Sequence, residues 1–191
     1  MDKISLIGIA GGSASGKGYI AKQLAQNLTS KGAKVAVICA DDYYKDVSHL
    51  TKEQLRHYDF DCPEAIAFDE LVSDIKMILN HKVVKMRKYD FISHKAIRDP
   101  NHFIDGSRID KLIVEGLFVL YVPAIRNMCD KKIFVDASSS TRLQRRMKRD
   151  VAERGISPEE TIRIFKTIVE PAHIKYVQSC KKYADTVIDN N

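Results

Sequence analysis

A glycine-rich segment near the start of the chain has the residue types needed to hold a polyphosphate. Residues 11–17 are Gly-Gly-Ser-Ala-Ser-Gly-Lys, between an apolar run at 4–10 and an amphipathic run at 17–31. Glycines let backbone N–H groups point at phosphates, a helix start adds partial positive charge, and Lys17 can reach the β and γ oxygens. This context favours a nucleoside triphosphate site over an incidental turn. The expected site residues are Gly11, Gly12, Ser13, Ala14, Ser15, Gly16, Lys17 and Gly18.

One position of this segment departs from the usual pattern of phosphate-binding loops. The residue after the lysine is normally Ser or Thr, whose hydroxyl is a ligand of Mg²⁺, and here it is Gly18. Tyr19 lies about 100° further round the predicted helix, so its phenol should not replace that hydroxyl. A water molecule could take the place of the missing ligand, with weaker metal binding.

Three carboxylates follow predicted strands and are candidates for catalysis and metal binding. Glu115 lies in an otherwise apolar run, where an unpartnered carboxylate would be costly, so we expect it to face a metal or a bound water. The alternative is a solvated loop just past the strand. Asp41 and Asp42 directly follow the second predicted strand, 35–40, and either could accept a proton from a substrate hydroxyl. A turn or a helix cap is their alternative role.

Four arginines are spaced as one stripe on a predicted helix. Arg142, Arg145, Arg146 and Arg149 stand at i, i+3, i+4 and i+7, a spacing that suits a polyanion. A solvated basic face paired with Asp150 and Glu153, or a nucleic-acid surface, explains this helix equally well. The phosphate-binding segment favours arginines that close over a γ-phosphate.

Aromatic residues near the middle of the chain could contact a heterocycle. Tyr89, Phe91 and His94 could stack on a ring and form hydrogen bonds with it, although aromatic residues two apart on a strand usually belong to a core. The other histidines show no metal-ligand spacing and carry no hypothesis.

The elements that would position these residues alternate between apolar and amphipathic runs, which is typical of an α/β fold. We expect a three-layer α/β/α arrangement with a mainly parallel five-stranded sheet. Predicted strands cover 4–10, 35–40, 112–117, 133–135 and 186–188. Predicted helices cover 17–31, 69–80, 139–154 and 158–182, and a short hairpin is expected within 83–92.

Length and composition limit the remaining possibilities. A chain of 191 residues, 45% of them hydrophobic, predicts one domain over 1–191, with a hairpin insertion at about 82–95 and a helical lid at about 142–158. Four dispersed cysteines and only a short apolar run before the glycines predict a cytoplasmic protein without a membrane segment. The net charge is +6, but the basic residues form no continuous patch, so a polyphosphate ligand and no nucleic-acid partner are expected.

Ordered motifs over nearly the whole chain resemble the uridine kinases, also called uridine-cytidine kinases, within the phosphoribulokinase and uridine kinase group of P-loop kinases. Besides 11–17, the matches are Asp-Asp-Tyr-Tyr-Lys at 41–45, Tyr-Asp-Phe-Asp-Cys-Pro at 58–63, Tyr-Asp-Phe-Ile-Ser-His at 89–94, Val-Glu-Gly at 114–116, Arg-Arg-Met-Lys-Arg-Asp-Val-Ala-Glu-Arg-Gly at 145–155 and Lys-Lys-Tyr-Ala-Asp at 181–185. The resemblance implies transfer of a phosphoryl group from ATP or GTP, with Mg²⁺, to the 5′ hydroxyl of uridine or cytidine. It also implies a tendency to form homo-oligomers.

The resemblance further implies individual roles. Asp41 would be the general base, assisted by Lys17 and Arg149 in catalysis, and Asp61 would hold the ribose hydroxyls. Arg149 and Arg154 would close over the triphosphate, and Glu115, with Asp41 through water, would serve Mg²⁺. The implied substrate-binding residues are Tyr44, Phe60, Asp61, Tyr89, Phe91, His94 and Arg146.

Two further positions depart from the family pattern. Ile156 stands where the family usually has another arginine, and Ile164 stands near a usual glutamine. These departures leave open a kinase for a different small alcohol or nucleoside. Gly18 leaves open a nucleotide-binding homologue with impaired catalysis.

Overall fold

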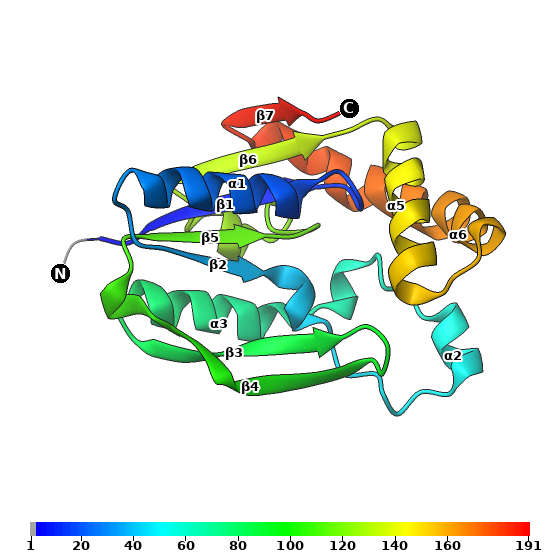
Figure 1. Cartoon of the computed structure of the whole chain (residues 1–191), viewed down its shortest axis with the longest axis horizontal. Helices are drawn as coiled ribbons and strands as arrows, with labels where there is room; N and C mark the ends of the chain where they lie inside the picture. Colours follow the sequence, from blue (N-terminus) through cyan, green and yellow to red (C-terminus); the bar gives the residue numbers. More distant parts are fainter. Residues whose placement is uncertain (1–2) are drawn as a thin grey trace.

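A parallel sheet of five strands forms the centre of the computed structural model, which describes residues 3–191 (Figure 1). The strands are β1 (Ser5–Gly11), β2 (Val35–Cys39), β5 (Lys111–Glu115), β6 (Lys131–Asp136) and β7 (Thr186–Asp189), in the order β2-β5-β1-β6-β7. Every neighbouring pair is parallel, so the mainly parallel five-stranded sheet predicted from sequence is confirmed. β1 lies at the centre, and the carboxyl ends of β1, β2 and β5 therefore meet at one edge.

Both faces of β1 are buried because successive side chains of a strand point to opposite faces. Ile7 and Ile9 pack with Ala21 of helix α1 (Lys17–Ser30) on one face. Leu6 belongs to the larger core on the other face, which α3 (Phe68–Leu79) and the 3₁₀ helix Gln178–Tyr183 complete. This burial explains the continuous apolar run in the sequence.

The hairpin beside this core is longer than the sequence predicts. Strand β3 (Val83–Asp90) pairs with β4 (Lys95–Asp105), so the segment 83–92 supplies only one strand and the turn. β4 is largely exposed and contains Pro100, and it therefore lacks the apolar alternation by which strands are recognised. Arg87 and Arg98 fasten the hairpin to α3 through Glu70 and Asp74.

The helical segment after residue 157 changes its winding along its length. It begins as α6 (Pro158–Ile164), widens to π helix over Phe165–Val169, returns to α7 (Glu170–Ala172), widens again over His173–Val177 and ends as the 3₁₀ helix. Pro171 lies inside this segment, and its ring has no N–H to donate to the preceding turn. The helix predicted at 158–182 is therefore present, but it is irregular.

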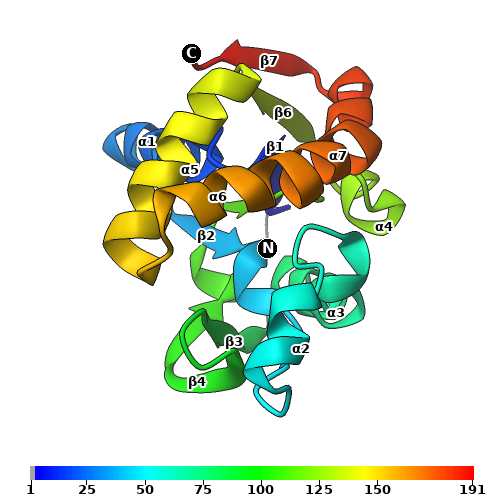
Figure 2. The same cartoon turned by 90° about the vertical axis from the view of Figure 1, so that its right-hand side faces the viewer.

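Three further α helices belong to the fold. These are α2 (Lys52–His57), α4 (Pro123–Arg126) and α5 (Ser139–Arg154). Figure 2 looks onto the end of the molecule where α5 and α6 lie across from α2. No helix within residues 3–191 is both long and apolar enough to cross a lipid bilayer.

Candidate active site

The phosphate loop, residues 11–17, connects β1 to α1 at the carboxyl edge of the sheet. Gly16 has φ of 89°, a left-handed conformation that other residues adopt with strain, and a Cβ there would lie 2.3 Å from Nδ2 of Asn190. A Cβ on Gly12 would lie 2.8 Å from Nδ1 of His173. Gly16 is therefore favoured by its backbone conformation, and a side chain at Gly12 would have to displace His173.

Asn190, the residue after β7, contacts the phosphate loop and supports it. Nδ2 of Asn190 donates to the carbonyl of Ser15 at 2.7 Å, and Arg145 donates to the carbonyl of Asn190 at 2.8 Å. The hydroxyl of Ser15 is buried and has no partner. An unpartnered buried hydroxyl within the loop fits a ligand that accepts or donates a hydrogen bond there.

A cavity of about 710 Å³ adjoins the phosphate loop and gathers most of the predicted site residues. It lies between the loop, α2, the hairpin turn, α5 and α6. The predicted residues that line it are Ser13, Lys17, Asp41, Tyr44, Phe60, Asp61, Phe91, His94, Arg146, Arg149 and Arg154. The predicted site residues that do not line it are Gly11, Gly12, Ala14, Ser15, Gly16, Gly18, Tyr89 and Glu115, of which Gly18 and Glu115 line a separate pocket. The cavity thus brings together residues that lie more than a hundred positions apart in the chain.

An aromatic wall bounds one side of the cavity. The rings of Phe60 and His94 are stacked with centroids 5.2 Å apart, and Tyr44 contacts Phe60 edge to face at 5.9 Å. Tyr89 is only 4% exposed and lies behind this wall, where its hydroxyl is 3.1 Å from Nδ1 of His94. Burial lowers the pKa of His94, which favours the neutral ring. Such a wall suits a planar group.

The two aspartates after β2 differ in their surroundings. Asp41 lines the cavity and its Oδ1 is buried without a partner. Asp42 instead accepts a hydrogen bond from the backbone N–H of Tyr89 at 3.4 Å. Asp41 is therefore the carboxylate with a free oxygen at the cavity, a distinction that the sequence left open.

Asp61 lies deep in the cavity. Its Oδ1 is 3.8 Å from Nη1 of Arg146, and its side chain is 12% exposed. Burial raises the pKa of Asp61, and the charge of Arg146 offsets only part of this effect. A carboxylate held in this way has remaining acceptor capacity for hydroxyl groups.

The residues near Gly18 fit a magnesium ion. Oε2 of Glu115 is buried without a partner, as is Oδ1 of Asp41. Burial raises the pKa of Glu115, and Lys17 opposes that shift. No group of three or more His, Cys, Asp or Glu side chains suited to a metal occurs within residues 3–191. Because Mg²⁺ is usually held by one or two carboxylates together with substrate phosphates and waters, two carboxylates are sufficient.

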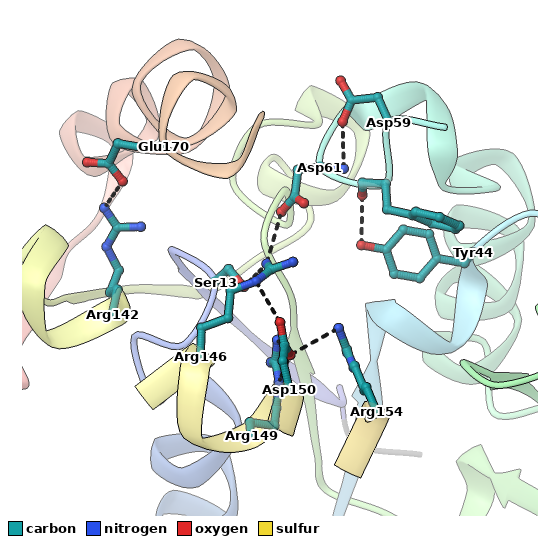
Figure 3. Close-up of polar contacts among 11 residues, drawn as sticks. Ser13, Tyr44, Asp59, Asp61, Arg142, Arg146, Arg149, Asp150, Arg154 and Glu170 are labelled. Carbon is teal, nitrogen blue, oxygen red and sulfur yellow. Dashed lines mark hydrogen bonds and ion pairs between the residues drawn. The ribbon is translucent and has the colours of Figure 1, made fainter. Parts of the chain in front are cut away.

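The arginine stripe divides into two groups, which corrects the sequence-based expectation (Figure 3). Arg146, Arg149 and Arg154 surround Asp150 beside the cavity. Arg142 is 2% exposed and pairs with Glu170 at 2.6 Å, on the side away from this cluster. Arg142 and Arg145 therefore have structural partners and do not line the cavity.

The cluster of Arg146, Arg149 and Arg154 also contacts the hairpin, since the guanidinium of Arg154 lies 4.8 Å from the ring centroid of Phe91.

Sequence reasoning missed several residues that line the cavity. These are Lys52, Leu55, Tyr58, Ile92, Leu117, Glu160 and Ile168. Tyr58 and Ile92 belong to the motifs at 58–63 and 89–94 but were given no role there, and the others lie outside the quoted motifs.

A phosphate loop opening a helix at the end of a central parallel strand, beside a carboxylate and three arginines, defines a P-loop phosphotransferase. The model of the phosphoribulokinase / uridine kinase family matches residues 6–191. The chain belongs to this family and is a phosphotransferase that acts on an alcohol.

Individual proteins show the same relationship. The chain is 38% identical over 188 residues to a uridine kinase of Staphylococcus aureus (strain JH9), covering 98% of this chain and 88% of that protein. A kinase of Silicibacter sp. TM1040, provisionally described as a fructose transport system kinase, superposes with a TM-score of 0.80 at 17% identity, covering 98% and 91%. A "Possible Uridine Kinase" from Bacillus stearothermophilus gives a TM-score of 0.63 at 20% identity, covering 99% and 90%. These two structures share the fold.

Proposed function

We propose that the chain transfers the γ-phosphoryl group of ATP to the 5′ hydroxyl of a pyrimidine nucleoside, converting uridine or cytidine to its monophosphate. The observation that carries this proposal is the single cavity in which Lys17 and Asp41 meet an aromatic wall and Asp61. A nucleoside has the complementary parts: a planar base, a ribose with hydroxyl groups and a primary alcohol. The relationship to a uridine kinase supports the same acceptor class.

In this proposal each residue has a defined task. The phosphate loop binds the triphosphate through its backbone N–H groups, and Lys17 contacts the β and γ oxygens. Asp41 accepts the proton of the acceptor hydroxyl as its oxygen attacks the γ-phosphorus in line. Arg149 and Arg154 stabilise charge on the transferred group, and Asp61 holds the ribose hydroxyls.

The proposal includes Mg²⁺, held by Glu115 and by Asp41 through water, which would neutralise phosphate charge. GTP is an alternative donor. The proposal also includes a cytoplasmic location, a tendency to form homo-oligomers and no nucleic-acid partner.

The test is an ADP-release screen of the purified protein across nucleosides, with Mg²⁺ and Mn²⁺ compared. Uridine or cytidine should give ADP and the nucleoside monophosphate. Asp41→Asn should lower kcat by about 100-fold or more, the usual contribution of a general base. Asp42→Asn is the matched control, since its carboxylate contacts a backbone N–H, and it should retain far more activity. Equal kcat values for the two variants would refute Asp41 as the base.

A second acceptor class has its own support. Ile156, Ile164 and Ile168 line the cavity together with Leu55, so part of its wall offers no hydrogen bonds. An acceptor with a less polar distal group than a pyrimidine would fit this wall better, because a polar edge would be left unpaired there. Turnover of another alcohol or nucleoside in the same screen, with uridine and cytidine silent, would select this alternative.

A further inference from the structure

Asp150 is a buried carboxylate of α5 that has no part in the mechanism proposed above. Asp150 is 1% exposed. Its Oδ1 accepts hydrogen bonds from Nε and Nη2 of Arg149 at 3.1 and 3.0 Å, and lies 3.5 Å from Nη1 of Arg154. Its Oδ2 accepts a hydrogen bond from Nε of Arg146 at 3.1 Å. A single side chain thus contacts all three arginines that line the cavity (Figure 3).

The spacing in α5 produces this arrangement. Arg146, Asp150 and Arg154 follow one another at intervals of four residues, which places them on one face of the helix. α5 ends at Arg154 and is capped by Gly155, which has a left-handed conformation with φ of 64°. The backbone N–H of Ile156 donates to the carbonyl of Asp150 at 3.1 Å. The side chain of Asp150 therefore contacts the arginines, while its backbone carbonyl, like that of any residue there, accepts the hydrogen bonds of the turn that ends α5.

Without this carboxylate the three guanidiniums would repel one another. Burial and the nearby charge of Arg149 lower the pKa of Arg154, and the charge of Asp150 opposes this shift. The side chains of Arg149 and Arg154 are 32% and 27% exposed, so each has solvent into which it could turn. The contacts with Asp150 oppose this movement by charge-assisted hydrogen bonds.

Arg146 connects the cluster to both ends of the cavity. Its Nη1 donates to the hydroxyl of Ser13 in the phosphate loop at 2.9 Å and lies 3.8 Å from Asp61. Asp150 fixes the other side of the same guanidinium through Nε. The position of Asp150 therefore determines where Arg146 meets the donor loop and the acceptor end.

We propose that Asp150 is a positioning residue for phosphoryl transfer, which holds Arg146, Arg149 and Arg154 in their ligand-binding arrangement before the nucleotide arrives. The inference rests on the proposed function for its catalytic part, but its nucleotide-binding part is independent of the acceptor. Preorganised groups bind a transition state without first being ordered, and displacement by about 1 Å can lower a rate about 100-fold.

The direction in which ATP affinity changes in an Asp150 variant distinguishes a positioning role of this carboxylate from an effect of its charge alone. Removal of a carboxylate near a polyanion should tighten binding if only the net charge matters. If Asp150 positions the arginines, Asp150→Asn should instead weaken Mg·ATP binding about tenfold, the equivalent of one lost charge-assisted hydrogen bond. Isothermal titration calorimetry with Mg·ATP and no acceptor measures this difference. Unchanged or tighter binding would overturn the proposal.

Two further variants complete the experiment. Glu153→Gln removes the same charge from an exposed position of α5 and should leave ATP affinity unchanged. Asp150→Glu keeps the charge on a longer side chain and should bind Mg·ATP more weakly than the wild type; wild-type affinity in this variant would also overturn the proposal, and it decides the matter if Asp150→Asn does not fold. Thermal midpoints, measured in parallel, ensure that only folded protein is compared. Because no acceptor is present, a wrong nucleoside assignment would appear only in the ADP-release screen.

Discussion

At the scale of single residues, the consequences of Gly18 depend on the space around it. Gly18 is exposed at the second position of α1, and a Cβ there would lie 3.4 Å from Oε1 of Glu115, an ordinary contact. A serine therefore fits, and its hydroxyl would be near Glu115, one of the two carboxylates proposed to hold Mg²⁺. The family's metal-binding hydroxyl could be restored without rearrangement of the loop.

Gly18→Ser should lower the Mg²⁺ concentration that gives half-maximal ADP release, because a hydroxyl ligand is added. Gly18→Ala is the control, since it adds the Cβ alone. Both should raise stability by up to about 1 kcal/mol through helix propensity, or about 2–4 °C in the thermal midpoint. The same Mg²⁺ dependence in both variants would mean that the hydroxyl does not reach the metal. Activity in Gly18→Ser alone, absent from the parent, would identify the parent as a nucleotide-binding homologue.

The ionised side chain of Asp61 should favour nucleoside binding but lower the stability of the folded protein. Burial raises its pKa in the folded protein, so the folded state holds the proton more tightly than the unfolded chain. The free energy of unfolding therefore falls as the pH rises from the unfolded pKa through the folded pKa, and stays lower above it.

Asp61→Asn should accordingly melt at a higher temperature than the wild type at about pH 8, and the difference should vanish below about pH 3.9, the ordinary pKa of Asp. The same substitution should raise KM for the nucleoside, because the neutral amide is a weaker acceptor for ribose hydroxyls. Thermal midpoints across the pH range, with KM for uridine at neutral pH, measure both effects. A variant less stable than the wild type at every pH would contradict the assignment of the destabilising charge.

At the scale of elements, a buried ion pair joins α5 to the irregular helical segment. Arg142 of α5 pairs with Glu170 of α7, and its guanidinium lies 5.5 Å from the ring centroid of Phe165. The Cδ of Arg142 would be 2.9 Å from a Cβ on Gly12, so the pair also supports the phosphate loop. Its contribution should therefore be structural.

Arg142→Ala should lower the free energy of unfolding by about 3–5 kcal/mol, because Glu170 would be left without its buried partner. Arg163→Ala removes a similar Arg–Glu pair with Glu160, but on an exposed side chain, and should change stability by about 1 kcal/mol or less. Urea unfolding followed by circular dichroism measures both values. Similar losses in the two variants would show that burial does not govern the strength of these pairs.

At the scale of the whole molecule, the sequence predicted the parts of the fold that carry strong local patterns. The five strands and the long helices were recognised because buried apolar runs and helical periodicity are local properties. β4 was missed since it is an exposed strand, and the winding changes around Pro171 depend on packing. The bounds given for the single domain, for the hairpin insertion and for the helical lid remain predictions.

The candidate site was predictable to a similar extent. Motif spacing identified the phosphate loop and the carboxylates, and the cavity gathers most of the residues that the family resemblance suggested. The separation of Asp41 from Asp42, and of Arg142 from Arg146, depends on the partner that each side chain finds in three dimensions. Asp150 was visible only as a nearby acidic residue, because burial cannot be seen from one helix. The roles of the site residues remain proposals.

The hydrogen bond from Asn190 to Ser15 connects the phosphate loop with a residue that lies 175 positions further along the chain. During translation, β1 and the phosphate loop leave the ribosome long before the segment that braces them. The loop can therefore receive this hydrogen bond only once Asn190, which follows β7, has been synthesised. A chain that has been synthesised only as far as β6 therefore lacks this support of its triphosphate-binding loop.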